Sequence, residues 1–313
     1  MNLPFPLPGV VALAFAVSGL SGQCASARQL NGFDVSNATI PVEEIRSGGP
    51  PRDGIPSIDH PKIEPAPEVN FLRDDDIVIG VEHKGEARAY PLRILVWHEI
   101  VNDVIADKPV TVTYCPLCGT AMVFDATVDG RQRSFGVSGL LFNSDVLMYD
   151  RETNSLWSQL GMRAVSGPAV GKTLTWLPSE RLTWKAWRTA HPNGEVLSPD
   201  TGHRRNYKED AYASYFASSE TMFPVPITRL ELPKKAWIVG VLVDGIAKAY
   251  PVDQLPAGGS FEDEINSRKL TIHWDPEARH AEVRGASGEP IPSVMVFWFA
   301  WQAFYPETLL WKA

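Results

Sequence analysis

Cysteine is scarce in this sequence, and the scarcity limits how the chain can be held together. Three cysteines occur among 313 residues, and two of them, Cys115 and Cys118, lie close together. Secreted domains that depend on disulfides are much richer in cysteine, so a disulfide scaffold is excluded. At this length the chain can instead bury a substantial hydrophobic core.

Basic runs and familiar catalytic motifs are missing as well. The chain has 29 Lys and Arg residues against 37 Asp and Glu residues, and its formal net charge is −8. Nucleic acid and anionic membrane surfaces are therefore not expected as partners. There is no phosphate-cradling loop, HExxH motif or GxSxG motif, so nucleotide binding and the common hydrolase chemistries have no support.

Long hydrophobic runs are also lacking, and the apolar run near the N-terminus, Val10 to Val17, is short. The first 27 residues carry no charged side chain and end in Ala25-Ser26-Ala27, which has the pattern of a signal-peptidase site. A basic segment before the apolar run, typical of signal peptides, is absent. We expect residues 1–27 to be a signal peptide and the mature protein to be soluble, periplasmic or secreted, without stable membrane insertion.

The most informative feature that is present is the segment 115–119, Cys-Pro-Leu-Cys-Gly. β-Branched and aromatic residues fill the segments 110–114 and 120–124 on either side of it, which predicts two strands joined by a tight turn. Such hairpins form the knuckles of zinc-ribbon and rubredoxin-type sites, where both sulfurs point to one ion and the glycine adopts positive φ. One knuckle supplies half of a metal site.

The sequence also contains an internal repeat. Residues 79–91, IGVEHKGEARAYP, recur at an offset of 160 as residues 239–251, VGVLVDGIAKAYP. The same offset aligns 108–116 with 268–276. The segments WRTAHP (187–192) and WQAFYP (301–306) match at an offset of 114, so the second copy is 46 residues shorter. The repeat predicts a duplicated scaffold.

We expect an α+β fold, mainly of antiparallel β-sheet, in which two unequal, internally duplicated lobes pack together. Residues 28–74 are rich in proline, glycine and acidic residues and predict an extended arm, either a mobile linker or a segment that wraps over the fold. The first lobe, 75–233, carries the knuckle and an insertion. The second and shorter lobe is 234–313.

Several long motifs resemble a family of exported bacterial proteins, domain of unknown function 3179. The resemblance runs from the Gly-Gly-Pro-Pro segment of the arm through the C-terminal lobe, and it implies export without implying an activity. The motifs that carry it are WHEIVND (97–103), YCPLCGT (114–120), FGVSGLLFNSD (135–145), MYDR (148–151) and SLWSQ (155–159).

The knuckle cysteines and His98 have no equivalents in the second copy, which favours a metal site in the first. The second copy has Asp275 and Ala278 at the positions of Cys115 and Cys118, and no counterpart of His98. We expect the two thiolates and His98 to bind zinc or copper, with Met148, water or an acidic group as the fourth ligand. Such a centre is either catalytic or metal-carrying.

Two alternatives stay open: a thiol-disulfide protein that uses the two cysteines, and a small-ligand binding module with a structural disulfide. A small molecule or a metal donor is the partner expected, and no oligomeric state is indicated. Polar residues near the knuckle are expected to form the wall of the site or to orient its ligands: Glu99, Asn102, Asp103, Ser138, Asn143, Asp145 and Trp157.

Overall fold

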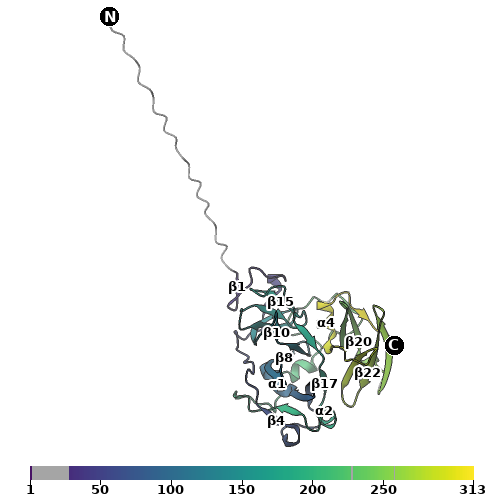
Figure 1. Ribbon diagram of the computed structural model, residues 1–313. Helices are drawn as coiled ribbons and strands as arrows, with labels where there is room; N and C mark the ends of the chain where they lie inside the picture. The colour runs from purple at the N-terminus through teal and green to yellow at the C-terminus, as the bar shows by residue number, and fades with distance from the viewer. Residues whose placement is uncertain (2–27, 227, 257) are drawn as a thin grey trace.

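The computed structural model describes residues 1, 28–226, 228–256 and 258–313 (Figure 1). Most of its regular structure is antiparallel β-sheet with a few short helices, which confirms the expected α+β class. We call residues 28–226 the N-terminal part and residues 237–311 the C-terminal part. The predicted signal peptide lies almost entirely outside the described residues. Among the helices that are described, none has the length and apolar character needed to cross a membrane.

The first sheet of the N-terminal part begins with a tight hairpin. Lys84 and Gly85 form its turn with φ of 51° and 83°, the left-handed values of a two-residue hairpin turn. One edge strand leads directly into helix α2 (Trp184–Ala190), and one strand at the other side pairs in parallel. The strand order is β17 (Glu180–Thr183), β5 (Ile77–His83), β6 (Glu86–Pro91), β18 (Glu195–Leu197) and β4 (Ile63–Pro65).

A sheet of the C-terminal part pairs its strands in the same senses. Its hairpin turns at Asp244 and Gly245, again with positive φ, and its edge strand leads into helix α4 (Trp298–Phe304). The strand order is β24 (Ser293–Phe297), β19 (Trp237–Val243), β20 (Ile246–Pro251) and β25 (Leu309–Leu310), with β20 and β25 parallel.

Each helix packs a tryptophan onto a glycine of the sheet beside it. A Cβ atom on Gly80 would lie 2.1 Å from the ring of Trp187, and one on Gly240 would lie 2.5 Å from the ring of Trp301. Only glycine leaves room for either ring, and both rings are fully buried. These contacts explain why the sequence keeps a glycine in the middle of two otherwise apolar strands.

A second sheet in each part follows the first hairpin. In the N-terminal part, helix α1 (Leu92–His98) leads into it, and in the C-terminal part the 3-10 helix η3 (Val252–Gln254) does so. The order in the N-terminal part is β16 (Thr175–Leu177), β9 (Thr120–Asp125), β8 (Lys108–Cys115) and β7 (Ile100–Ile105), and that in the C-terminal part is β21 (Gly259–Ile265), β22 (Arg268–Asp275) and β23 (His280–Gly285).

A further sheet belongs to the N-terminal part alone and lies next to the knuckle. Its order is β15 (Arg163–Ser166), β14 (Leu156–Ser158), β13 (Asp145–Asp150), β12 (Phe135–Phe142) and β3 (Arg46–Ser47). The remaining elements are short: β1 (Gln29–Leu30), β2 (Phe33–Asp34), β10 (Thr127–Val128), β11 (Arg131–Gln132), α3 (Ala213–Ala217), η1 (Val42–Glu44) and η2 (Ala66–Glu68).

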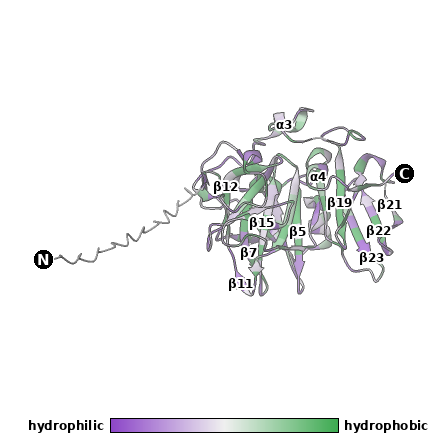
Figure 2. Cartoon of the chain, turned by 90° about the horizontal axis from the view of Figure 1, so that it is seen from above, coloured by the Kyte–Doolittle hydropathy of each residue, from purple (hydrophilic) through white to green (hydrophobic). Residues whose placement is uncertain are grey.

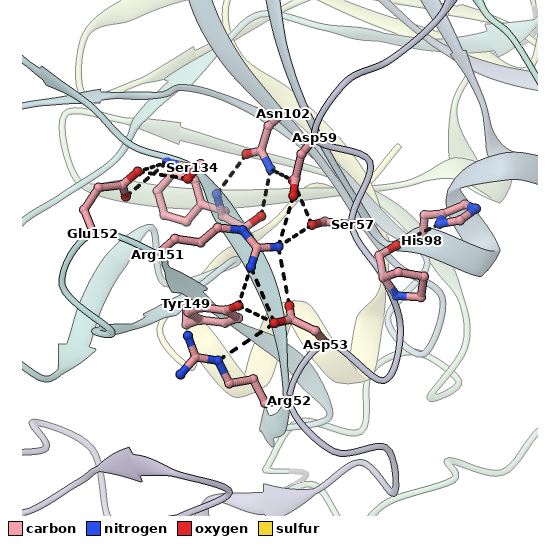
Figure 3. Close-up of polar contacts among 12 residues, drawn as sticks. Arg52, Asp53, Ser57, Asp59, His98, Asn102, Ser134, Tyr149, Arg151 and Glu152 are labelled. Carbon is pink, nitrogen blue, oxygen red and sulfur yellow. Dashed lines mark hydrogen bonds and ion pairs between the residues drawn. The ribbon is translucent and has the colours of Figure 1, made fainter. Parts of the chain in front are cut away.

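The segment 28–74 packs against the body of the molecule. Besides its strands β3 and β4, it is held by polar contacts that converge on Arg151 (Figure 3). The Arg151 guanidinium donates a 2.8 Å hydrogen bond to Ser57 and lies 3.3 Å from the Asp59 carboxylate. Asp53 accepts a 2.5 Å hydrogen bond from the Tyr149 hydroxyl. The arm therefore has fixed partners over its length next to β13.

The two parts meet through reciprocal backbone hydrogen bonds. The Phe297 amide at the end of β24 donates to the Cys118 carbonyl at 2.9 Å, and the Thr183 amide at the end of β17 donates to the Ala278 carbonyl at 2.8 Å. The knuckle is thus docked onto the C-terminal part through its own backbone.

In Figure 2, hydrophobic residues run along β5 and β19, whereas polar residues are frequent on β22 and β23.

Candidate metal centre

The two cysteines lie in the turn between β8 and β9. Cys115 ends β8 and pairs with Thr120 at the start of β9, so the turn between the strands contains Cys118 and Gly119. Gly119 has φ of +70°, as the knuckle pattern predicted. Both cysteines are free thiols and are buried, at 1% and 0% exposure. The hairpin therefore places two thiols in the protein interior.

An aspartate approaches the thiols from the neighbouring sheet. Asn143 and Ser144, with φ of 52° and 62°, form the two-residue turn between β12 and β13, and Asp145 follows at once. One ligand atom from each of Cys115, Cys118 and Asp145 lies within 4.8 Å of the other two. The Ser144 carbonyl accepts from both thiols, at 3.6 and 3.3 Å. The turn thus brings a carboxylate and a carbonyl to the knuckle.

Burial governs the charge of these three groups. It raises the pKa of Asp145 to about 7, although hydrogen bonds from the amides of Leu160 and Val146 oppose the rise. Asp145 Oδ2 accepts from the Leu160 amide at 2.9 Å, whereas the buried Oδ1 has no N–H or O–H partner within the part of the chain described, and the two thiols beside the carboxylate also oppose the rise. Burial also raises the pKa of both thiols. A bound cation would stabilise the deprotonated form of all three.

Glu99 lies beside this group and carries a second buried carboxyl. It follows α1 with φ of 58° and is 7% exposed. Burial, and next the charge of Asp145, raise the pKa of Glu99 to about 8. The same residue lines a small cavity of about 70 Å³ whose other walls include Leu117 and Tyr212. Glu99 therefore places a carboxyl group, close to the cluster, in a cavity lining that is otherwise mostly apolar.

His98, expected as the third ligand, lies outside this group. Its Nδ1 donates to the Pro56 carbonyl of the arm at 2.7 Å, which leaves Nε2 to accept from the Tyr207 hydroxyl, also at 2.7 Å. Figure 3 shows the ring turned toward the arm. Burial lowers the pKa of His98 to about 4, so the imidazole is neutral. With both nitrogens engaged, the ring secures the arm and the segment around Tyr207.

Met148 and Trp157 occupy the apolar core beside the cluster. They face each other across β13 and β14 and share a hydrophobic cluster with both cysteines. The Trp157 indole donates to Asp150 at 2.8 Å. In this setting the Met148 thioether fills core space, as methionine commonly does.

The other residues expected in the wall serve the scaffold. Asn102 clamps the backbone of Phe135 by donating to its carbonyl at 2.8 Å and accepting from its amide at 2.9 Å. Asp103 accepts from Tyr90 and Arg88 at 2.7 and 2.8 Å. Ser138 bonds to the backbone of Leu147 and Leu140 at a bulge of β12, and Asn143 donates to the Ala303 carbonyl.

Two segments that were not predicted from the sequence cover the knuckle. Tyr215 on α3 donates a 2.8 Å hydrogen bond to the Leu117 carbonyl, and Ser144 donates to the Phe223 carbonyl. The signal that was available is the spacing of Tyr212, Tyr215 and Phe216, which places three aromatic rings on one helical face.

Comparison with known proteins agrees with the motifs quoted above. No curated protein and no solved structure matches the chain. One family model matches residues 52–288, which is most of the sequence and includes the knuckle and the strands β12 to β15. The chain belongs to the family described as protein of unknown function (DUF3179).

Proposed function

We propose that Cys115, Cys118 and Asp145 form a zinc centre. The observation that carries this proposal is the convergence of three buried ligand atoms, each within 4.8 Å of the others. Two neutral thiols and a carboxyl with an unpartnered oxygen have no evident role as packing groups, because an unsatisfied buried polar atom costs free energy. A divalent cation would supply the missing partner.

The donor set favours zinc over copper(I). Copper(I) prefers soft thiolate and thioether ligands, whereas zinc readily accepts a carboxylate beside thiolates. Three protein ligands leave the fourth position of a tetrahedral zinc ion open, as in catalytic centres. The Glu99 carboxyl lies near enough to this centre for Asp145 to shift its pKa. The burial of all three ligands favours a resident ion over a carrier, which must release its metal.

The thiol-disulfide alternative is weaker on these observations. Reactive cysteines are partly exposed and have a lowered pKa, often at the start of a helix. Here both thiols are buried with a raised pKa, and a strand follows the motif. These features favour metal binding over thiol exchange.

Metal analysis of the purified, zinc-reconstituted protein tests the proposed ligand set. We expect one zinc per chain for the wild type and for His98→Gln, and loss of zinc for Cys115→Ser and Asp145→Asn. Circular dichroism of each variant serves as the control for folding. Loss of zinc from His98→Gln with retention by Asp145→Asn would overturn the assignment.

We also infer that the chain arose by duplication and that the copies diverged at the knuckle. In support, β5, β6, β8 and β9 have counterparts shifted by 160 residues and paired in the same order. The Asp275 carboxylate accepts from the amides of Glu277 and Ala278, at 2.9 and 3.0 Å, and so closes the equivalent turn. In the first copy, a metal would tie this turn instead.

Export remains part of the proposal. The charge-free first 27 residues and their Ala-Ser-Ala ending support it. Mass spectrometry of the protein recovered from a periplasmic fraction should give Arg28 as the N-terminal residue. Recovery of the uncleaved chain from the cytoplasm alone would refute export.

A further inference from the structure

A cavity lined by residues of both the N-terminal and the C-terminal part contains none of the proposed zinc ligands. Its volume is about 460 Å³, within the range of small-molecule sites. Aromatic rings from both parts line it, including Tyr114 of β8 and Trp237 of β19. The combination of flat apolar walls and charged side chains is typical of a site for a small organic ion.

Arg181 of β17 extends into this cavity without a carboxylate partner. Its Nε is buried with no hydrogen-bond partner within the described residues, and its one hydrogen bond is a 3.7 Å contact from Nη1 to the Met295 sulfur. The guanidinium lies 5.2 Å from the centre of the Trp237 ring. The guanidinium is partly buried, and a partly buried cation without a counter-ion is costly, so this arrangement favours a bound anion.

A second guanidinium makes the need for an anion stronger. Arg279, in the turn after β22, also lines the cavity. Burial is the main cause of a lowered pKa of Arg181, and the positive charge of Arg279 lowers that pKa further. Lys235 reaches the same cavity and is held there by the carbonyls of Tyr215 and Ser218, at 2.5 and 2.8 Å. Three cations thus surround one space.

Four carboxylates also line the cavity, those of Asp75, Asp76, Glu209 and Asp210. Asp76 lies 2.7 Å from Arg93, and Asp75 lies 3.6 Å from Arg73. Asp210 accepts from the backbone amide of Tyr212 at 2.9 Å. Within the described residues none of these acids forms an ion pair with Arg181, whose contacts are the Met295 sulfur and the Trp237 ring.

We propose that this cavity binds a small organic carboxylate with a flat apolar body. The carboxylate would pair with Arg181, whose planar guanidinium matches carboxylate geometry, and Arg279 would add charge. The apolar body would lie against Trp237. The proposal does not depend on the zinc centre.

Calorimetric titration of the full chain with benzoate tests this site. We expect saturable binding to the wild type, at least tenfold weaker binding of the neutral analogue benzyl alcohol, and weaker binding of acetate, which lacks the ring. Arg181→Met should weaken benzoate binding at least tenfold. Methionine is the matched choice because Met295 occupies the corresponding place in β24.

A purely structural role for Arg181 gives a different result. In that case Arg181→Met would lower the unfolding temperature, whereas our proposal predicts an unchanged or higher unfolding temperature without ligand, because an unpaired, partly buried charge is removed. Lack of saturable benzoate binding to the wild type, or equal binding by Arg181→Met, would overturn the proposal.

Two further titrations test the identity of the bound anion and the independence of the cavity from the zinc centre. Tighter binding of phenyl phosphate than of benzoate would assign a phosphate ester to the cavity and overturn the carboxylate. The Asp145→Asn variant should bind benzoate as the wild type does, so failure of the zinc proposal and failure of this one can be distinguished. Loss of benzoate binding in Asp145→Asn would contradict the independence of the two sites.

Discussion

At the scale of single residues, the centre depends on which carboxyl lies next to the thiols. Asp145 and Glu99 are both buried acids with a raised pKa, but only the Asp145 carboxylate lies within 4.8 Å of both sulfurs. Asp145 should therefore be a zinc ligand, whereas Glu99 should be a neighbour that does not contact the ion. The sequence predicted both residues for the wall of the site but could not predict which one lies nearer the thiols, because distances between separate sheets cannot be deduced from spacing along the chain.

Asp145→Asn tests the ligand. Loss of a residue that only orients a metal ligand typically lowers metal affinity by roughly 10- to 100-fold. Because an amide oxygen binds zinc poorly, Asp145→Asn should lower zinc affinity by more than this. Glu99→Gln is the matched control and should fall within that range. Competition with a chromophoric chelator measures both. Equal losses in the two variants would remove the distinction between them.

The buried acids also predict how the stability of the metal-free protein depends on pH. Glu99 and Asp145 have ordinary pKa values of 4.5 and 3.8 when unfolded but about 8 and 7 when folded, so the folded state holds more protons. The free energy of unfolding should therefore fall as the pH rises from 6.5 to 8. His98 is neutral when folded but half protonated at pH 6.5 when unfolded, so it opposes this fall, but only by the loss of that half proton.

Urea denaturation with a chelator present, at pH 6.5 and at pH 8, measures this dependence. Glu99→Gln cannot titrate and should reduce the difference between the two values. A metal-free wild type that is equally stable or more stable at pH 8 would show that these carboxyls are not buried as described.

At the scale of elements, the knuckle hairpin requires Gly119 for two reasons. Its φ of +70° is unfavourable for other residues, and an added Cβ would lie 2.5 Å from the Trp237 ring. Gly130, in the β10–β11 turn, has φ of +72° and open space around it. A substitution at Gly130 therefore measures the cost of positive φ without a steric clash.

Gly130→Ala should cost about 1 kcal/mol of stability from its backbone alone. Gly119→Ala should cost clearly more and should also weaken zinc binding, because the Trp237 ring must move. Thermal unfolding and zinc titration of both variants check this. Equal destabilisation would mean that the contact with Trp237 contributes nothing.

The elements themselves were largely predictable from the sequence. The β-branched and aromatic segments on either side of the knuckle predicted β8 and β9, which the structure confirms. The position of His98 was not predictable, because its partners Pro56 and Tyr207 come from segments without periodic pattern. Irregular segments reveal their contacts only in the folded chain.

At the scale of the whole molecule, the C-terminal part supports the knuckle through the hydrogen bond from the Phe297 amide to the Cys118 carbonyl. An ion that fixes the knuckle should therefore also fix the end of β24. We predict that zinc slows amide hydrogen exchange at Phe297 but leaves the outer strand β21 unchanged. Exchange slowed equally throughout would indicate general stabilisation, and no change at Phe297 would contradict the coupling.

Anomalous diffraction at the zinc absorption edge, from crystals of the zinc-loaded protein, tests the central claim most directly. The account predicts one peak about 2.3 Å from the sulfurs of Cys115 and Cys118 and about 2.0 to 2.2 Å from an Asp145 oxygen. A peak at His98, or a Cys115–Cys118 disulfide with no ion beside it, would rule out a zinc centre formed by Cys115, Cys118 and Asp145.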